Sequence, residues 1–245
     1  PIKNPYTGQI YAIGVVPASQ ITPFAKAVLA GLPDPNLPGT SNNYESSPSD
    51  TTSSDKGDLR YDQYIGQKIT TFARYSQGDI RIFNPANIPG PVGGNANGNV
   101  YIRNKQLVPG ATWTVSPTSV LEVRVGFDYT EAGKNPLALG SDLGDFGVPN
   151  LPSDATVAGG LYTLNFGGGL SQLGRQGSNP QYQYPLVLDP KVNFTKILGR
   201  HSLKMGFEYQ MIDTAVSDFH PQYGSDNYTG YFTNPSSTSP SGVNQ

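Results

Sequence analysis

The side chains with the greatest potential for chemistry are few and widely spaced. The chain has 245 residues with two histidines and no cysteine, which excludes thiol nucleophiles, iron–sulfur clusters and cysteine zinc sites. His201 and His220 lack the spaced partners that metal-binding motifs require. No G-x-S-x-G elbow, Walker motif or complete dinucleotide fingerprint occurs. We therefore expect no enzyme activity, no metal site and no cofactor.

Four aspartates in Gly-, Ser- and Asn-containing segments are the remaining candidates for a cation site. Carboxylates bind Ca²⁺ when several of them converge at a defined spacing. Asp142, Asp145, Asp154 and Asp226 do not follow EF-hand spacing. We interpret them as solvated loop carboxylates.

A second group of charged residues alternates with apolar ones. In Leu121–Tyr129 every odd position is apolar or Tyr and every even position is charged or Gly, and Leu203–Met211 has the same period. This period of two predicts strands with one apolar and one charged face. In a membrane barrel the charged face lines a wet lumen, whereas in a soluble sandwich it is the solvated outside. The candidate lumen-facing residues are Arg60, Asp62, Arg74, Glu122, Arg124, Asp128, Lys204 and Glu208.

Three antiparallel hairpins would carry these residues. Their turns are short and the connections between them are long and rich in Gly, Pro, Asn and Ser, which is the layout of an outer-membrane β-barrel. The predicted fold class is all-β, with up-and-down hairpins from a transmembrane barrel and one short N-terminal helix. The expected bounds are a loop region over 1–55 with a helix near 23–30, hairpins at about 58–76, 100–131 and 184–217, and a Ser/Pro/Gly-rich loop or tail over 218–245. Pro109 and Gly110 are expected to interrupt the second hairpin.

Composition narrows the class of protein. A net charge of −2 argues against a nucleic-acid binder, which needs a basic surface. Charged residues make up 14%, well below the usual share of about 25%, and aromatic residues at 11% are too frequent for a simple disordered chain. These values fit a β-rich surface or outer-membrane protein.

Closure of the sheet is the open question. The smallest membrane barrels have about eight strands, and the three hairpins supply fewer. An open sheet in lipid would leave backbone groups unpaired at both edges. We therefore expect either a part of a longer barrel or a unit whose edges pair with neighbours.

Several short segments resemble a known family in the order in which they occur. The segment Ile2–Gly8 followed by Val16–Lys26 resembles the "D-P-x-T-G … I-P-x-x-R-I-x-P" segment of Oar-like TonB-dependent receptors, although Gln20 stands where the family often has Arg. Leu121 replaces an Asn of the family's second hairpin. The other matching segments are Leu32–Asn36, Asn42–Tyr44, Asp58–Asp62, Phe72–Ser76, Ser116–Gly126 and Gly199–Gly206.

The resemblance implies a segment from the middle of a receptor barrel of about 22 strands in the outer membrane of a Gram-negative bacterium. Such receptors, which carry a carboxypeptidase-regulatory-like domain, take up siderophores, cobalamin, glycans or peptides. Uptake is driven by the TonB system through a plug that gates the lumen. The partners implied are TonB, outer-membrane lipid and an unknown external ligand.

Two other readings stay open. Hairpins with exposed edges could pair between copies and form a structural or adhesive filament. A secreted β-sandwich binding module is also compatible with the composition.

Overall fold

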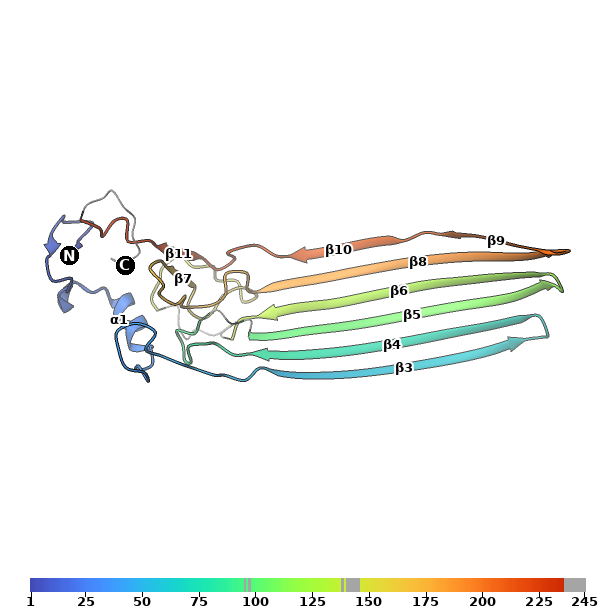
Figure 1. Ribbon diagram of the computed structural model, residues 1–245, viewed down its shortest axis with the longest axis horizontal. Helices are drawn as coiled ribbons and strands as arrows, with labels where there is room; N and C mark the ends of the chain where they lie inside the picture. Colours follow the sequence, from blue (N-terminus) through green and yellow to red (C-terminus); the bar gives the residue numbers. More distant parts are fainter. Residues whose placement is uncertain (95, 97, 138, 140–145, 236–245) are drawn as a thin grey trace.

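A computed structural model describes residues 1–94, 96, 98–137, 139 and 146–235. Most of this structure is one long antiparallel sheet with the long connections gathered at one end and the short turns at the other (Figure 1). The strands of the sheet are β3 (Thr51–Ile65), β4 (Ile69–Asn84), β5 (Gly98–Ser116), β6 (Ser119–Asn135), β8 (Gln181–Leu198), β9 (His201–Glu208) and β10 (Met211–Ser217). The smaller elements are β1 (Ile2–Lys3), β2 (Ile10–Tyr11), a 3₁₀ helix (Ala18–Gln20), α1 (Pro23–Ala30), β7 (Thr163–Phe166) and β11 (Ser225–Tyr228).

The strand order of the sheet is β10-β8-β6-β5-β4-β3, with β9 also paired to β8. β9 and β10 share one register on β8, because Glu208 lies opposite Lys191 and Met211 opposite Leu188. They therefore act as one strand with a break, at which the Tyr209 N–H donates to the Pro190 carbonyl oxygen at 3.0 Å. The all-β, up-and-down architecture is confirmed, and the described residues form an open sheet.

The hairpin turns are tight because their residues permit the required backbone angles. Gly66 between β3 and β4 has a φ of 62°, and Gly199 between β8 and β9 has a φ of 59°. Glycine adopts these angles without steric cost. The turn between β5 and β6 holds only Pro117 and Thr118.

The strands are longer than the alternation predicted. β3 begins at Thr51 rather than near Asp58, so residues 51–55 are strand and not loop, and β4 continues to Asn84. Cross-strand pairing explains the extension, since Thr51 still lies opposite Phe83. The other hairpin regions likewise span 98–135 and 181–217. Cross-strand pairing overrides the loop-like Ser, Thr and Asp composition of these ends.

Pro109 and Gly110 do not interrupt β5, contrary to expectation. Pro109 lies opposite Ala73 of β4, and the β5–β6 ladder has no pairing at positions 108 and 109. The missing N–H of a proline costs least at such a gap. Gly110 leaves room for the Phe72 ring, which a Cβ at this position would meet at 2.5 Å.

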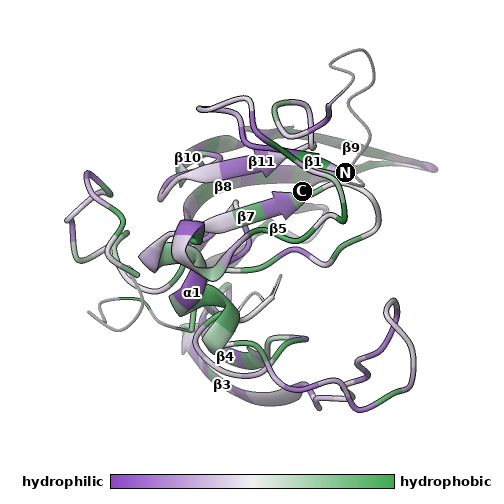
Figure 2. Cartoon of the chain, turned by 90° about the vertical axis from the view of Figure 1, so that its left-hand side faces the viewer, coloured by the Kyte–Doolittle hydropathy of each residue, from purple (hydrophilic) through white to green (hydrophobic). Residues whose placement is uncertain are grey.

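The long connections fold together over the ends of the strands (Figure 2). Four segments contribute to one apolar core: the helix region, the β4–β5 loop, the β6–β8 loop and the segment after β10. The predicted loop after β6 and the predicted tail after residue 217 therefore contain strands, since β7 and β11 pair in parallel. Residues 236–245 of the tail lie outside the described residues. We define this loop cluster by its buried core residues Val28, Val92, Leu161, Tyr162, Leu164, Leu173 and Tyr223.

The helix α1 carries the N-terminal region into this cluster. Thr22 caps it, because its Oγ1 accepts a hydrogen bond from the Ala25 N–H at 3.1 Å, and Pro23 occupies the first turn. The Phe24 ring stacks on Tyr162 with centroids 6.0 Å apart. In the described part of the chain, no helix has the length and apolarity needed to cross a membrane.

We predict that Gly174→Ala loosens the loop cluster. Gly174 has a φ of 76°, and a Cβ there would overlap the Tyr162 carbonyl oxygen. Gly169 is the matched control, because its φ of 82° carries the same backbone strain but a Cβ would have nothing within 4 Å. We expect Gly174→Ala to cost about 2 kcal/mol more than Gly169→Ala, measured as faster protease cleavage of the 146–180 segment. Equal cleavage of both variants would contradict the packing described above.

Candidate functional site

The register of the sheet brings the predicted charged residues onto one face. Arg60 lies opposite Arg74, Arg124 opposite Lys191, and Lys191 opposite Glu208. Because residues that pair directly across strands point to the same side, these positions share a face. All eight predicted residues and several others belong to this charged face, which we define by Asp58, Arg60, Asp62, Arg74, Glu122, Arg124, Asp128, Asp189, Lys191, Lys204 and Glu208.

Short ion pairs compensate the charges of this face. Arg60 and Arg74 are like charges placed opposite each other, which alone would be unfavourable. Arg60 pairs with Asp62 at 2.8 Å, and Arg74 pairs with Asp58 at 2.8 Å. Lys191 bridges Asp189 and Glu208, each at 2.9 Å. Within the described residues, Glu122, Arg124, Asp128 and Lys204 form no ion pair.

Uncharged residues that the sequence analysis did not select complete the face. The Phe72 ring lies 4.4 Å from the Arg60 guanidinium carbon and 5.9 Å from that of Arg124. The Asn104 and Gln106 amides donate to the two oxygens of Asp128 at 2.9 and 2.6 Å. Asn104 and Gln106 lie two residues apart in β5, so the alternation of the sequence could have placed both amides on the charged face. The contact of the Phe72 ring with the arginines could not have been found in this way, because it depends on Gly110 in the neighbouring strand.

The opposite face of the same strands is apolar and exposed. Met205 and Phe207 of β9 are 58% and 66% exposed, although large apolar side chains are usually covered in a soluble protein. We define this apolar face by Leu59, Tyr61, Tyr75, Leu107, Trp113, Leu121, Val123, Phe127, Tyr129, Leu186, Met205 and Phe207.

Both faces change polarity toward the loop end of the strands. On the apolar face, the next residues toward the loops are polar. These define the polar collar: Asp55, Gln77, Asp79, Arg81, Arg103, Lys105, Glu131 and Asp213. On the charged face, the corresponding residues of β4, β5, β8 and β10 include Ile80, Ile82, Val100, Ile102, Val187 and Ile212, whereas β3 and β6 keep polar residues there, among them Ser54, Lys56, Thr130 and Lys134.

The apolar section of a strand has about the length that a tilted strand needs to cross a membrane. From Leu121 to Tyr129 the strand β6 extends about 26 Å at about 3.3 Å per residue. Outer-membrane barrels carry an apolar band of about 25 Å, which a tilted strand crosses with about 9–11 residues. β5 has 19 residues and β6 has 17, so the strands continue beyond such a band on the loop side.

A buried arginine organises the loop cluster. Arg175 is 7% exposed, donates to the carbonyl oxygens of Val157 and Gly159, and lies with its guanidinium carbon 4.0 Å from the Tyr223 ring centroid. Burial lowers the pKa of Arg175 to about 10, still well above neutral pH. A charged guanidinium therefore joins the β6–β8 loop to the segment after β10.

Two of the four aspartates that were interpreted as solvated loop carboxylates accept hydrogen bonds from protein groups, and one of them, Asp226, lies in the strand β11. The Tyr162 hydroxyl donates to Asp226 at 2.6 Å, and burial together with this carboxylate raises the pKa of Tyr162. Asp154 accepts from the Thr156 N–H and hydroxyl, which lower the pKa of Asp154. Asp142 and Asp145 lie outside the described residues. Within the part that is described, no group of three or more metal-ligating residues occurs.

Comparison with known proteins gives one family. Residues 1–245 match the family described as outer membrane beta barrel domain. No curated protein and no solved structure matches the chain.

We predict that Arg175→Met destabilises the loop cluster by about 3 kcal/mol, because two buried carbonyl oxygens lose a charged donor. Arg200→Met is the control, since Arg200 is exposed in the β8–β9 turn and surface changes cost at most about 0.5 kcal/mol. Protease sensitivity of the loops and thermal unfolding measure both variants. If Arg175→Met behaved like Arg200→Met, the guanidinium would not be a structural centre of the cluster.

Proposed function

The chain belongs to the outer membrane beta barrel domain family, and on that premise we propose that it forms part of a receptor that binds an external ligand and passes it through a gated barrel. Membership of this family makes it an outer-membrane protein of a Gram-negative bacterium. Binding and transport without catalysis is the activity we propose.

The observation that carries the proposal is the division of the sheet into an apolar and a charged face. A barrel wall in lipid needs an apolar outside, while a wet lumen accepts charges of both signs. We therefore assign the apolar face to lipid and the charged face, including Arg60, Arg124 and Glu208, to the lumen. The ion pairs of the charged face favour this assignment, because they compensate the charges of Arg60, Arg74 and Lys191 while leaving them accessible.

The loop cluster supports a receptor rather than a simple pore. Long connections at one end of the strands fold around a core of their own, and such loops are where binding residues concentrate. We assign this end to the cell exterior, since outer-membrane barrels have long external loops and short periplasmic turns.

The resemblance to Oar-like receptors supplies the finer part of the proposal. It suggests energy from the TonB system, transmitted through a plug, and a ligand among siderophores, cobalamin, glycans and peptides. The residues of the charged face would then contact the plug or the passing ligand.

The free sheet edges support a second candidate, a structural or adhesive protein. Among the described residues, nothing pairs with the outer edge of β3 or of β9 and β10. Exposed edges pair readily with other strands. Further strands of one polypeptide would close a barrel, whereas strands of further copies would build a filament.

We predict that neighbouring positions of one strand have different surroundings, lipid on the apolar face and water on the charged face. Because the chain has no cysteine, a fluorophore can be attached singly through Leu59→Cys or Arg60→Cys, and through Met205→Cys or Lys204→Cys on the opposite edge. In reconstituted vesicles, spin-labelled lipid should quench the probes at 59 and 205, and aqueous iodide those at 60 and 204. The reverse pattern would contradict the assigned orientation.

We predict that uptake requires both this protein and the proton gradient. Cells with and without the whole protein are offered labelled ferric siderophore, cobalamin, oligosaccharide or peptide in turn, before and after an uncoupler. Accumulation of at least one probe should fall several-fold in cells without the protein, and also in cells that are treated with the uncoupler. Binding of cells to one another that depends on the protein, with no gradient-dependent uptake, would instead favour the adhesive candidate.

A further inference from the structure

Two arginines of the polar collar are held side by side by one carboxylate. Arg81 donates from Nε to Asp79 Oδ1 at 3.0 Å, and Arg103 donates from Nε to Asp79 Oδ2 at 3.3 Å. The Arg81 side chain is 71% exposed and that of Arg103 is 46% exposed. Because both arginines use Nε for Asp79, this carboxylate leaves their terminal nitrogens to a second anion, and of these Arg103 Nη1 also faces Glu131 at 3.8 Å. Paired guanidinium groups are well suited to phosphate.

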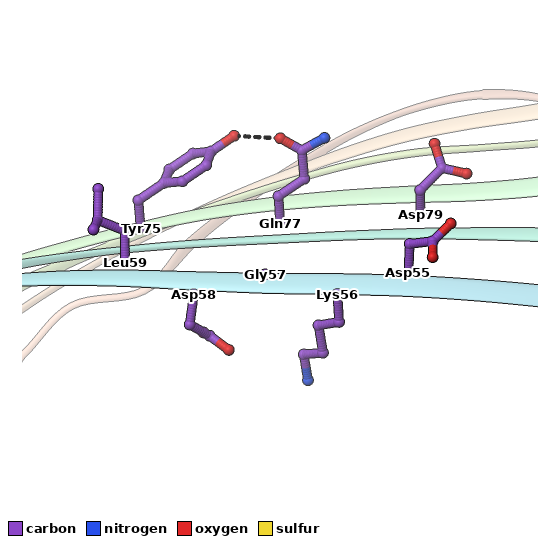
Figure 3. Close-up of a pocket in the computed structure, with 8 residues that line it drawn as sticks. All are labelled: Asp55, Lys56, Gly57, Asp58, Leu59, Tyr75, Gln77 and Asp79. Atoms are coloured by element: carbon purple, nitrogen blue, oxygen red, sulfur yellow. Dashed lines mark hydrogen bonds between the residues drawn. The ribbon is translucent and has the colours of Figure 1, made fainter.

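A hollow of about 450 Å³ begins at the border between the apolar face and the polar collar. Gly57 leaves it open, with Leu59 and Tyr75 at one end and Asp55 and Asp79 at the other (Figure 3). The Tyr75 hydroxyl donates to Gln77 across its floor at 2.8 Å. Lys56 and Asp58 point to the other side of the strand (Figure 3). One end of the hollow is therefore apolar and the other end is polar.

A second hollow, of about 330 Å³, continues toward the loops and contains both arginines. Ser53, Phe83 and Tyr101 also line it. The Tyr101 ring lies over Gly133, where a Cβ would meet its hydroxyl at 2.7 Å, and the Arg103 guanidinium carbon is 5.4 Å from the ring centroid. The aromatic ring limits the positions that Arg103 can take.

We propose that these adjoining hollows bind the phosphate-bearing headgroup of an outer-leaflet glycolipid, with Arg81 and Arg103 contacting the phosphate and Leu59 and Tyr75 contacting an acyl chain. The inference rests on the proposed orientation of the apolar face toward lipid and specifies which lipid is held there. The observation that carries the inference is the order of two surfaces along the strands, in which the apolar face is followed by the arginine pair toward the loops. An anionic headgroup lies above its acyl chains, as the arginine pair lies on the loop side of the apolar face, with Gln77 and Lys105 between them.

The carboxylates around the arginines set the strength of the site. Arg81, Arg103 and Asp79 together carry one positive charge, while Asp55 and Glu131 flank them and Lys105 lies one step nearer the apolar face. Glu131 is 3.8 Å from Arg103 Nη1 and competes with the phosphate for that nitrogen. Removing the charge of Glu131 should therefore strengthen binding, whereas removing the arginines should weaken it.

The test uses the whole protein reconstituted in phosphatidylethanolamine vesicles with or without lipid A. The lipid A that stays bound after mild detergent extraction is counted by mass spectrometry. We expect Arg81→Gln combined with Arg103→Gln to lower the retained lipid A about tenfold, and Glu131→Gln to raise it. Arg74→Gln is the matched control, because Arg74 also pairs with an aspartate, at 2.8 Å, but on the charged face.

Several outcomes would overturn the proposal. The first is equal retention by the arginine double variant and the unmodified protein, and the second is an equal loss with Arg74→Gln. Displacement of lipid A by inorganic phosphate would identify a site for free anions instead. A Glu131→Gln variant that loses lipid as the arginine double variant does would also overturn the proposal, because removing a competing carboxylate should strengthen a phosphate site. Fluorophore quenching at positions 59 and 60 reports the orientation separately, so failure of this site and failure of the proposed orientation are distinguishable.

Discussion

The need to pair every backbone N–H and C=O group away from water governs this structure. In the hydrocarbon of a membrane an unpaired peptide group costs several kcal/mol, so a crossing strand must have a neighbour on each side. β4, β5, β6 and β8 meet this requirement along nearly their whole length. The gap beside Pro109 shows the same rule on a small scale, because the residue without an N–H occupies the position where the ladder has no pairing. β3 and β10 meet it on one side only, which is why the sheet must be completed by other strands.

Once the ladder is set, side-chain chemistry is free to differ on the two faces. A soluble sheet would hide its apolar face against a second layer, yet here Phe207 and Met205 are exposed and the buried core lies in the loop cluster instead. The exchange of polarity along β4 and β5 then follows from a change of surroundings. Leu107 and Arg103 lie on the same side of β5, and only the solvent around that side need differ between them. A protein without a membrane has no comparable reason to change the polarity of both faces at one height.

The fold could be predicted from sequence where the physics is local, and not where it depends on distant segments. Leu121–Tyr129 shows its strand by strict alternation, and Gly199 shows its turn by its conformational freedom. The strand ends at 51–57 and 77–84 could not be found in this way, because they depend on partners across the sheet rather than on their own composition. The loop cluster was missed entirely. Its core joins Val28, Val92 and Tyr223, and no local period connects positions so far apart.

The candidate site, like the fold, could be predicted from the sequence only in part. Alternation alone was enough to select Arg60, Arg124 and Glu208 as residues of one face. Alternate residues of a strand lie on the same face, whichever strand pairs with it. It could not select Asp79 as the residue that holds two arginines, since that contact needs Arg103 from the neighbouring strand. Arg175 lay beyond reach for the same reason, since its partners come from a distant part of its own loop and from the segment after β10. Regular backbone pairing therefore makes a face predictable, whereas a binding site on that face is made by the particular side chains that the register brings together.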